Sequence, residues 1–309
     1  MPDIVISEFM EPAAIDRLRD GFTVHYDPQL FADPARLNAA VGGCRALIVR
    51  NATQVRAPLL AAARNLGIIG RLGVGLDNID TELCAAGGIK VVPATGANAI
   101  SVAELAIGAM LVLMRGTYHV SDRLRAGEWP RLELMGREIF GKTLGLVGFG
   151  HVAMALAERA RGMGLAVIAH DPAFADDDPV WRARGAEPAS LARILAEADI
   201  LSVHVPLTDA TRNLIGAAEL ALMKPRAIVI NTARGGIVDE RALAAALKAG
   251  RIAGAALDVF ETEPFDRASP LADAPNALLM PHVGAMTEES NQRVCSMIAD
   301  AVIAHLRGA

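Results

Sequence analysis

Short apolar runs recur along the chain, and most are followed by a stretch with helical spacing. In the first third they lie at residues 4–7, 24–26, 46–49, 68–72 and 91–92. Apolar runs of this length, bounded by turn residues, predict strands, and strands that alternate with helices predict parallel βαβ units. Helices cover both faces of such a sheet. The pattern therefore predicts one α/β domain here.

The same alternation begins again after residue 140. Strands are predicted at residues 143–148, 166–171, 200–206, 227–233, 253–259 and 278–280. The intervening helices are predicted at residues 152–163, 191–196, 217–223 and 240–249. Strands joined by crossover helices in this number are typical of a dinucleotide-binding sheet.

Two helices mark the borders of these domains. Ser101 and Glu104 have the spacing of a capping box, which predicts a long helix running toward Arg125. This helix is apolar nearly all round, so we expect it to be buried on several sides, including against another subunit. A last helix, residues 288–306, follows the second sheet and is expected to return to the first domain.

The fold class is thus α/β, with two doubly wound parallel-sheet domains of the Rossmann type. The predicted division places residues 1–96 and 283–309 in a split domain and residues 97–282 in a continuous one. The active site is expected in the cleft between them.

Composition excludes several classes of protein. The chain has 309 residues, is 52% hydrophobic and carries a formal net charge of −5, which argues against nucleic acid as a general partner. The apolar run 105–114 is too short to cross a bilayer, and the N-terminus lacks the basic start of a signal peptide. Cys44, Cys84 and Cys295 have no metal-binding spacing. We expect a cytoplasmic protein with no metal site and no membrane partner.

A glycine-rich turn follows the strand at residues 143–148. Gly148 permits a tight turn, and Gly150 lets the backbone approach a pyrophosphate. His151 and Val152 then open a helix whose N-terminus attracts anions. Ala153 stands at the third glycine position, a known variant of the pattern. The alternative is a packing turn that binds nothing.

Asp171 ends the next strand, 21 residues after Gly150, which is the spacing of a carboxylate that binds the adenosine ribose. A negative charge there repels a 2′-phosphate, so NAD is favoured over NADP. In the alternative interpretation, Asp171 only starts a turn before Pro172.

Three chemically active residues each follow a predicted strand: Arg234, Glu263 and His282. Ligands of an open parallel sheet bind at the carboxyl ends of its strands. Arginine matches a carboxylate, and a carboxylate beside histidine orients the imidazole as a general acid or base. Alternatively, Arg234 is a surface side chain and His282 is structural.

These motifs together resemble the D-2-hydroxyacid dehydrogenase family, in particular its phosphoglycerate dehydrogenase branch. The most specific matches are residues 49–53, 70–80, 98–105, 231–240, 255–264 and 281–287. The resemblance implies a split substrate-binding domain and an NAD-binding domain. It implies that Arg234 holds the substrate carboxylate and that His282 is the acid or base paired with Glu263. It also implies that the backbone of Val74 and Gly75 binds the carboxylate.

For the cofactor, the resemblance implies that Asp258 holds the nicotinamide amide. The groove would further be lined by His204, Val205, Pro206, Thr232, Ala233, His282 and Gly284.

The branch implies that Arg50, Arg71 and, from a neighbouring subunit, Arg131 reach a second anionic group of the substrate, and Asn51 is a further expected substrate-binding residue. The alternative for Arg71 and Arg131 is a structural ion pair, for example with Asp77 or Glu133. We therefore expect a 2-hydroxy acid with a phosphate or sulfonate on C3.

Residues 4–10, with Arg50, Asn51 and residues 73–77, are similar to enzymes that oxidise (S)-3-sulfolactate to 3-sulfopyruvate. 3-Phosphoglycerate is the next candidate, followed by reduction of glyoxylate or hydroxypyruvate. The long apolar helix and the family both imply a homodimer. A different class, the NAD-sensing co-repressors that act as binding modules, shares this fold.

Overall fold

The computed structural model describes residues 1–117 and 120–308, and divides the chain into two compact units. Unit 1 comprises Met1–Asn98 and Ala285–Ala309, and unit 2 comprises Ala99–Gly284. Both borders lie two residues beyond those expected from the sequence. The shift at the first border arises because α5 begins at Ala99. No helix in the described ranges is long and apolar enough to cross a membrane.

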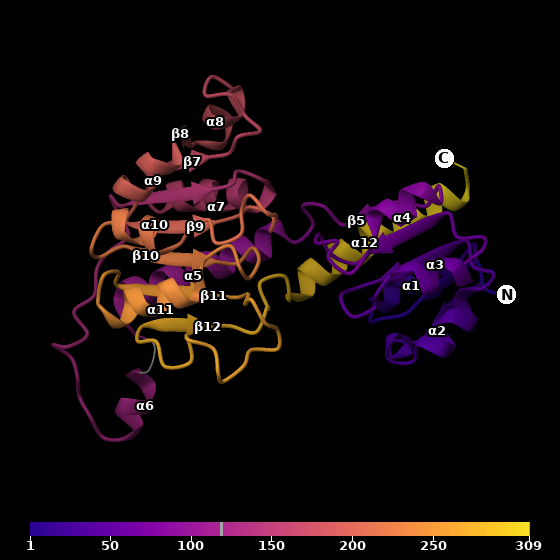
Figure 1. Ribbon diagram of the computed structural model, residues 1–309, viewed down its shortest axis with the longest axis horizontal. Helices are drawn as coiled ribbons and strands as arrows, with labels where there is room; N and C mark the ends of the chain where they lie inside the picture. Colours follow the sequence, from indigo (N-terminus) through magenta and orange to yellow (C-terminus); the bar gives the residue numbers. More distant parts are fainter. Residues whose placement is uncertain (118–119, 309) are drawn as a thin grey trace. The chain divides into compact units, whose positions relative to one another are not determined.

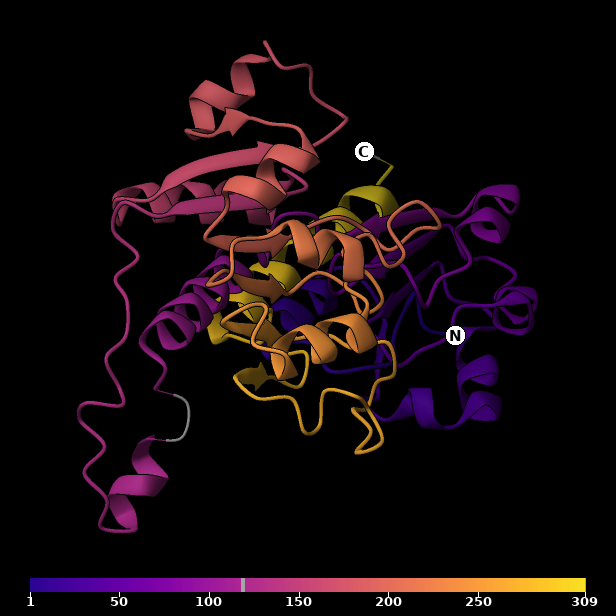
Figure 2. The same ribbon diagram turned by 60° about the vertical axis from the view of Figure 1, so that its left-hand side comes forward.

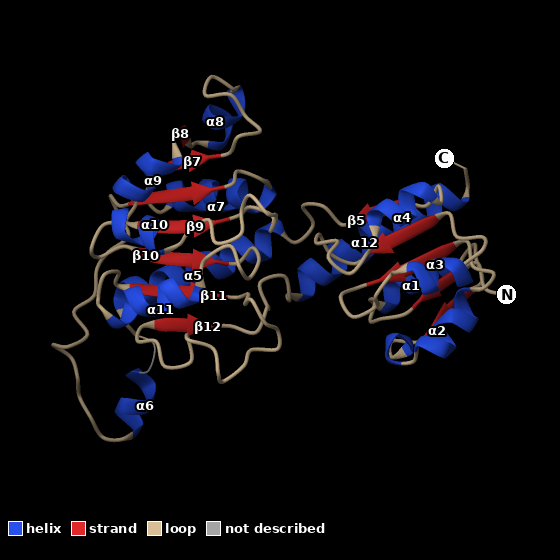
Figure 3. Cartoon of the chain, in the orientation of Figure 1, coloured by secondary structure: helices blue, strands red, loops and turns tan. Residues whose placement is uncertain are grey.

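Unit 1 is built on a five-stranded parallel sheet in the order β2-β1-β3-β4-β5 (Figures 1 and 3). Its strands are β1 (Ile4–Ile6), β2 (Val24–Tyr26), β3 (Ala46–Val49), β4 (Ile68–Arg71) and β5 (Lys90–Pro93). Its helices are α1 (Pro12–Arg19), the short η1 (Leu30–Ala32), α2 (Pro34–Val41), α3 (Ala57–Ala62), α4 (Thr81–Ala86) and α12 (Glu288–Leu306).

Both faces of this sheet are buried. Ile4, Ile48 and Ile68 pack in one cluster with α12, and their strand neighbours pack with α2 and α3 in another. At Gly70 a Cβ would lie 2.5 Å from Ile298, so glycine is what lets α12 approach the sheet. The C-terminal helix returns to the first domain, as the sequence predicted.

Unit 2 contains a seven-stranded parallel sheet in the order β12-β11-β10-β9-β6-β7-β8. Its strands are β6 (Thr143–Val147), β7 (Ala166–His170), β8 (Glu187–Pro188), β9 (Ile200–Val203), β10 (Ile228–Asn231), β11 (Gly254–Leu257) and β12 (Ala277–Leu279). Its helices are α5 (Ala99–Arg115), α6 (Val120–Arg125), α7 (His151–Gly162), α8 (Pro179–Arg184), α9 (Leu191–Glu197), α10 (Ala217–Leu222) and α11 (Glu240–Lys248). The chain proceeds from β6 outward to β8 and then returns to β9 on the other side, which places the ligand-binding switch point between β6 and β9.

The predicted fold class is confirmed, and three details of the prediction were wrong. The long helix ends at Arg115 instead of continuing to Arg125, because Gly116 follows in a left-handed conformation (φ 65°). The capping box is absent: the Ser101 hydroxyl lies inside α5 and donates to the carbonyl of Gly284. The short edge strand β8 has too few apolar residues to be visible in the pattern. Figures 1 and 2 show α6 and the segment after it projecting from the sheet of unit 2.

Candidate active site

The three residues singled out by the sequence follow three adjacent strands of one sheet. Arg234 comes after β10, Glu263 after β11 and His282 after β12, and these strands pair in parallel. Because parallel strands end at the same edge, all three residues belong to one edge of unit 2. The imidazole Nδ1 of His282 lies 2.8 Å from a carboxylate oxygen of Glu263. Both side chains are partly exposed, so a ligand can reach them.

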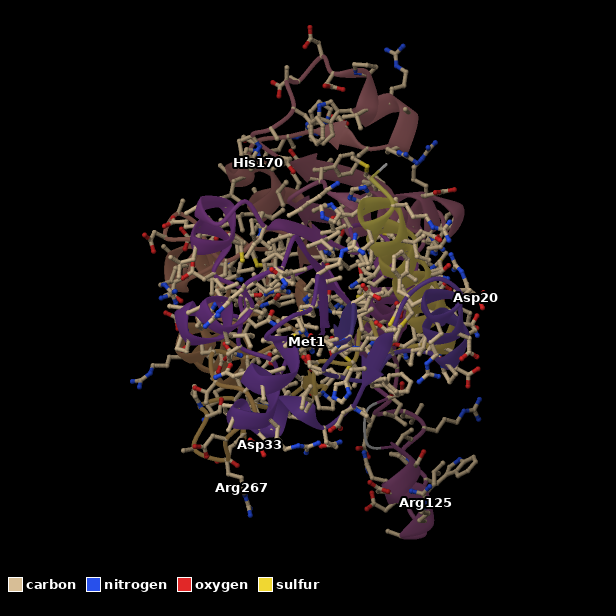
Figure 4. All side chains as sticks on the ribbon, turned by 90° about the vertical axis from the view of Figure 1, so that its right-hand side faces the viewer. Met1, Asp20, Asp33, Arg125, His170 and Arg267 are labelled. Atoms are coloured by element: carbon tan, nitrogen blue, oxygen red, sulfur yellow. The ribbon has the colours of Figure 1, made fainter. Side chains whose placement is uncertain are left out.

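The geometry of this pair defines the tautomer of His282. An ionised carboxylate can only accept a hydrogen bond, so Nδ1 must donate to Glu263. In the neutral ring the other nitrogen, Nε2, then carries the lone pair and can take up a proton. The second oxygen of Glu263 accepts the backbone N–H of Phe260 at 3.1 Å, which anchors the carboxylate to its own loop. Arg267 on the same loop points into solvent (Figure 4).

A buried carboxylate holds the backbone next to His282. His282 has a positive φ of 55°, unusual for a residue with a side chain. Asp258, only 1% exposed, accepts the N–H of Val283 at 2.8 Å and that of Gly284 at 2.7 Å. Burial raises the pKa of Asp258 above its ordinary value, and the two hydrogen bonds only partly offset this. Asp258, expected at the cofactor, thus also fixes the turn that carries His282.

The turn that presents Arg234 is organised by Asn231, the last residue of β10. The buried Asn231 amide accepts the N–H of Ala233 at 3.0 Å and donates to the carbonyl of Arg234 at 2.8 Å. A Cβ on Gly235 would lie 1.9 Å from the carbonyl oxygen of Phe260, so only glycine fits there. The Arg234 turn and the Glu263 loop are therefore packed directly against each other.

The glycine-rich turn of β6 and α7 has the features of a phosphate cradle. Gly148 has φ 89°, and a Cβ there would lie 2.6 Å from the carbonyl oxygen of His204. A Cβ at Gly150 would meet nothing within 4 Å, and no side chain caps α7 at this residue. The first N–H groups of α7, at His151 and Val152, can therefore point at an anion.

Asp171 has the turn role of the alternative interpretation, and it also contacts the glycine-rich turn. One of its oxygens accepts the N–H of Phe149 at 2.8 Å, and the other accepts the N–H of Ala173 at 2.9 Å. The carboxylate therefore starts a turn and also braces the glycine-rich turn. Each oxygen keeps a further lone pair that can accept a hydrogen bond from a ribose hydroxyl.

Next to β6, the end of β9 supplies His204, Val205 and Pro206. Burial lowers the pKa of His204 to about 4, so its ring is neutral at pH 7, and Nε2 lies 2.9 Å from the Ser202 hydroxyl. Thr232 has a buried hydroxyl without a hydrogen-bond partner among the described residues. An orphaned hydroxyl at the same sheet edge as an open glycine cradle fits a bound dinucleotide such as NAD.

Unit 1 brings together the residues expected at the substrate. Arg50 and Asn51 follow β3, and Arg71 ends its neighbour β4. Arg71 donates to the side-chain oxygen of Asn51 at 2.8 Å. Val74 and Gly75 follow β4 at the same edge, and the Val74 side chain is exposed. The sequence therefore located a cluster of polar groups at this edge.

Arg131 lies in the exposed segment between α6 and β6 of unit 2. The Glu133 partner suggested for Arg131 pairs instead with Arg123 at 2.9 Å. The reason is local: Arg123 lies in the last turn of α6 and reaches both Glu128 and Glu133.

Three residues at these edges escaped sequence reasoning. Glu8 and Asn291 contact the Arg50 loop, and Asn231 builds the Arg234 turn. Glu8 carried a usable signal, because it follows a buried strand as Asp258 does. Asn291 carried none, since its contact depends on how α12 returns to unit 1.

Comparisons with known proteins identify the family and the fold. Residues 107–284 match the family model described as "D-isomer specific 2-hydroxyacid dehydrogenase, NAD binding domain". The chain is 50% identical to an (S)-sulfolactate dehydrogenase of Chromohalobacter salexigens, over 98% of this chain and 97% of that protein. It is 42% identical to a D-3-phosphoglycerate dehydrogenase of Methanocaldococcus jannaschii, over 85% of this chain and 50% of that protein. The crystal structure of the TT0316 protein from Thermus thermophilus superimposes with a TM-score of 0.89, at 33% identity, covering 99% of this chain and 97% of that one.

Proposed function

The chain belongs to the D-isomer specific 2-hydroxyacid dehydrogenase family, and we propose that it oxidises (S)-3-sulfolactate to 3-sulfopyruvate. It is an oxidoreductase that uses NAD. One observation carries the choice of substrate: the near full-length, 50% identity to an (S)-sulfolactate dehydrogenase. The D-3-phosphoglycerate dehydrogenase relative keeps 3-phosphoglycerate as the competing substrate.

In the proposed mechanism, His282 is the general base. Its Nε2 accepts the proton of the substrate hydroxyl, while Nδ1 stays bonded to Glu263, 2.8 Å away. The Glu263 carboxylate stabilises the imidazolium that forms. Arg234 binds the substrate carboxylate through its planar guanidinium and orients the α-carbon. In the reverse direction His282 returns the proton to the carbonyl oxygen.

The cofactor is proposed to lie along the carboxyl edge of the unit 2 sheet. When bound, NAD accepts the hydride released from the α-carbon. The glycine-rich turn and the start of α7 would hold the pyrophosphate, and Asp171 would bind the adenosine ribose. His204, Thr232 and Asp258 would line the nicotinamide end. The negative charge of Asp171 supports a preference for NAD over NADP.

The distal sulfonate is proposed to bind at the unit 1 edge. Arg50, Asn51 and Arg71 supply two guanidinium groups and an amide there, and the backbone N–H groups of Val74 and Gly75 would bind the carboxylate. Arg131 is proposed as a further cation. Arg50 appears in none of the ion pairs described for residues 1–117 and 120–308, which leaves its charge for a ligand.

We also propose a homodimer, formed through the segment after α6 instead of the long apolar helix. Most of the apolar side chains of α5 are buried within unit 2. The segment after α6 instead exposes large apolar side chains, at least 74% accessible: Trp129, Leu132, Met135 and Phe140. A second copy of the chain is the partner that we propose for this surface. Light scattering of the wild-type protein tests this, and a monomer at micromolar concentration would contradict it.

The substrate proposal is tested by side-by-side kinetics. We expect kcat/KM for (S)-3-sulfolactate to exceed that for 3-phosphoglycerate, malate and D-glycerate. Arg50→Ala should raise KM for sulfolactate at least about tenfold while changing KM for D-lactate much less, because only sulfolactate has a distal anion. The exposed Arg64→Ala is a control for removing a charge from the same unit.

Two other results would overturn this assignment. A higher kcat/KM for 3-phosphoglycerate, or for hydroxypyruvate reduction, would move it to that substrate. NAD binding without turnover of any hydroxy acid would favour the co-repressor-like binding module.

A further inference from the structure

The loop after β3 is wrapped around one carboxylate. Glu8, 6% exposed, accepts N–H groups from four consecutive residues. Oε1 accepts from Arg50 at 2.8 Å and Thr53 at 2.9 Å, and Oε2 accepts from Asn51 at 3.0 Å and Ala52 at 2.9 Å. A bend of this kind directs four backbone donors inward, and each would be costly to bury without an acceptor.

Glu8 is therefore held in its charged form. Burial alone raises the pKa of Glu8, but the hydrogen bonds from Ala52, Thr53 and Arg50 together outweigh burial, so the pKa lies below its ordinary value. Protonation would remove acceptor capacity from a group that faces four donors. The loop conformation and the charge of Glu8 thus depend on each other.

The other side of the loop is also fixed. The Asn78 amide donates to the carbonyls of Arg50 at 3.2 Å and Thr53 at 2.8 Å. The Thr53 hydroxyl lies 2.8 Å from that of Ser7. The backbone of the loop therefore has hydrogen-bond partners on both its N–H and its carbonyl sides, as expected of a segment that presents side chains in one orientation.

Within the part of the chain that the structure describes, the Arg50 side chain is held by neutral groups. Its guanidinium donates to the side-chain oxygen of Asn291 on α12 and to the carbonyl of Phe9 at 3.5 Å, and lies 5.8 Å from the centre of the Phe9 ring. An amide or a ring orients a guanidinium without cancelling its charge, whereas a carboxylate would neutralise it. The arrangement keeps the cation oriented and available.

We propose that Glu8 and Asn291 are positioning residues that set Arg50 and Asn51 for a distal anion of the substrate. Glu8 acts on the backbone of the loop, and Asn291 acts on the guanidinium. This inference rests on the proposed function of Arg50 as the residue that binds the C3 sulfonate or phosphate.

The first test replaces Glu8 by glutamine, which keeps the shape but turns an amide NH₂ toward backbone donors. KM for sulfolactate should rise about tenfold or more, as expected for breaking a buried charge-assisted network, while the Kd for NADH stays within about twofold. Glu8→Asp, which keeps the charge on a shorter stem, should recover part of the loss. Glu82→Gln makes the same change at an exposed site of unit 1 and should have no effect. An equal rise in KM for sulfolactate and in the Kd for NADH would overturn the role of Glu8, and so would an unchanged KM.

The second test replaces Asn291 by aspartate, which gives Arg50 an ionic partner of nearly the same shape. KM for sulfolactate should rise about tenfold, and KM for D-lactate should change less than about twofold, because lactate does not use the distal cation. Gln292→Glu adds the same charge to the next, exposed residue of α12 and controls for long-range electrostatics. Equal effects of the two variants on both substrates would overturn the role of Asn291. This test stays informative even if Glu8→Gln fails to fold.

Failure of this inference is distinguishable from failure of the proposed function. If the wild type prefers 3-phosphoglycerate, both tests apply unchanged with that substrate in place of sulfolactate. If the wild type prefers an acid without a distal anion, the substrate proposal falls, and the role of both residues falls with it. If sulfolactate is preferred and neither variant shifts its KM, the proposed function stands and only the positioning role is refuted.

Discussion

Each of the two units contains a buried carboxylate that accepts backbone N–H groups, but the pKa values of the two carboxylates shift in opposite directions. In each, an acidic residue that follows a buried strand accepts backbone N–H groups from a segment that carries a proposed ligand-binding side chain. Glu8 receives four such bonds, and its pKa falls. Asp258 receives two, and its pKa rises because burial outweighs them. A larger number of hydrogen-bond donors around a buried carboxylate favours its charged form.

The segments that these carboxylates hold also differ. Glu8 organises a whole loop in which two side chains face a proposed distal anion. Asp258 restrains the two residues that follow His282, whose φ is 55°. Under the proposed function, the unit 1 edge binds an anion through fixed cations, and the unit 2 edge orients a single imidazole. Mutations at the two edges should therefore separate into effects on KM and effects on kcat.

The largest effect is expected at His282. His282→Ala should lower kcat about a thousandfold, because the hydroxyl proton loses its acceptor, while the Kd for NADH changes little. The exposed His25→Ala in unit 1 is a matched control. Stopped-flow turnover and NADH fluorescence titration separate the two quantities. A kcat within about threefold of wild type would refute the assignment of His282 as the proton acceptor and the contrast between the edges.

The second effect concerns stability at acid pH, and it should arise in unit 2. The pKa of His204 is about 4 in the folded chain, below the ordinary value near 6.5 in the unfolded chain. Between these values the unfolded state binds the additional proton, so stability falls as the pH drops from about 6.5 to 4. The loss is at most about 3 kcal/mol at the acid end. The Glu8 contribution, in contrast, is complete above its unfolded pKa and is lost only at lower pH.

Denaturation followed by the fluorescence of Trp181, which stacks on Phe149 of the glycine-rich turn, reports on unit 2. His204→Gln should have a flatter dependence of unfolding free energy on pH between 7 and about 4.5. His25→Gln should keep the wild-type slope. Parallel curves for the wild type and His204→Gln would show that folding does not lower the pKa of this histidine.

The sequence predicted the unit 2 edge more fully than the unit 1 edge, for a physical reason. An apolar strand precedes each of the three residues Arg234, Glu263 and His282 in the sequence, and the ends of parallel strands share an edge. Those signals are local. The contact of Glu8 with the Arg50 loop spans more than 40 residues, and that of Asn291 with Arg50 spans 241. Such contacts depend on strand order and on the return of α12, which periodicity does not encode.

The end of α5 shows the same distinction within one helix. The sequence predicted a helix running toward Arg125, whereas α5 ends at Arg115 and Gly116 follows in a left-handed conformation. Glycine was visible in the sequence, but an isolated glycine is compatible with both a helix interior and a helix end. The Ser101 hydroxyl likewise has the spacing of a cap, yet it donates to Gly284, a residue distant in the sequence. A tertiary contact overrode local preference at Ser101, whereas a local backbone conformation ended the helix at Gly116.

The third effect tests the smaller of the two carboxylate networks. Asp258→Asn should lower kcat by about tenfold to a hundredfold, since one of the N–H groups of Val283 and Gly284 then faces an amide NH₂. KM for sulfolactate should change less than in Glu8→Gln. Asp273→Asn, at an exposed site of unit 2, is the control. If Asp258→Asn raised KM for sulfolactate as much as Glu8→Gln and left kcat intact, the division of roles between the two edges would be wrong.

The smallest effect is expected at Asp171, where one carboxylate has both a structural and a proposed ligand-binding role. Asp171→Asn keeps one oxygen for the N–H of Phe149 but removes the charge, whereas Asp171→Ala removes both. If the charge sets cofactor preference, both variants should raise KM for NAD about tenfold and improve use of NADP, because the repulsion of the 2′-phosphate is gone. If Asp171 only braces the glycine-rich turn, Asp171→Asn should resemble the wild type and Asp171→Ala should lose NAD and NADP binding equally. The exposed Asp176→Asn controls for net charge in the same unit. The ratio of kcat/KM with NAD to kcat/KM with NADP then distinguishes a role in cofactor preference from a structural role.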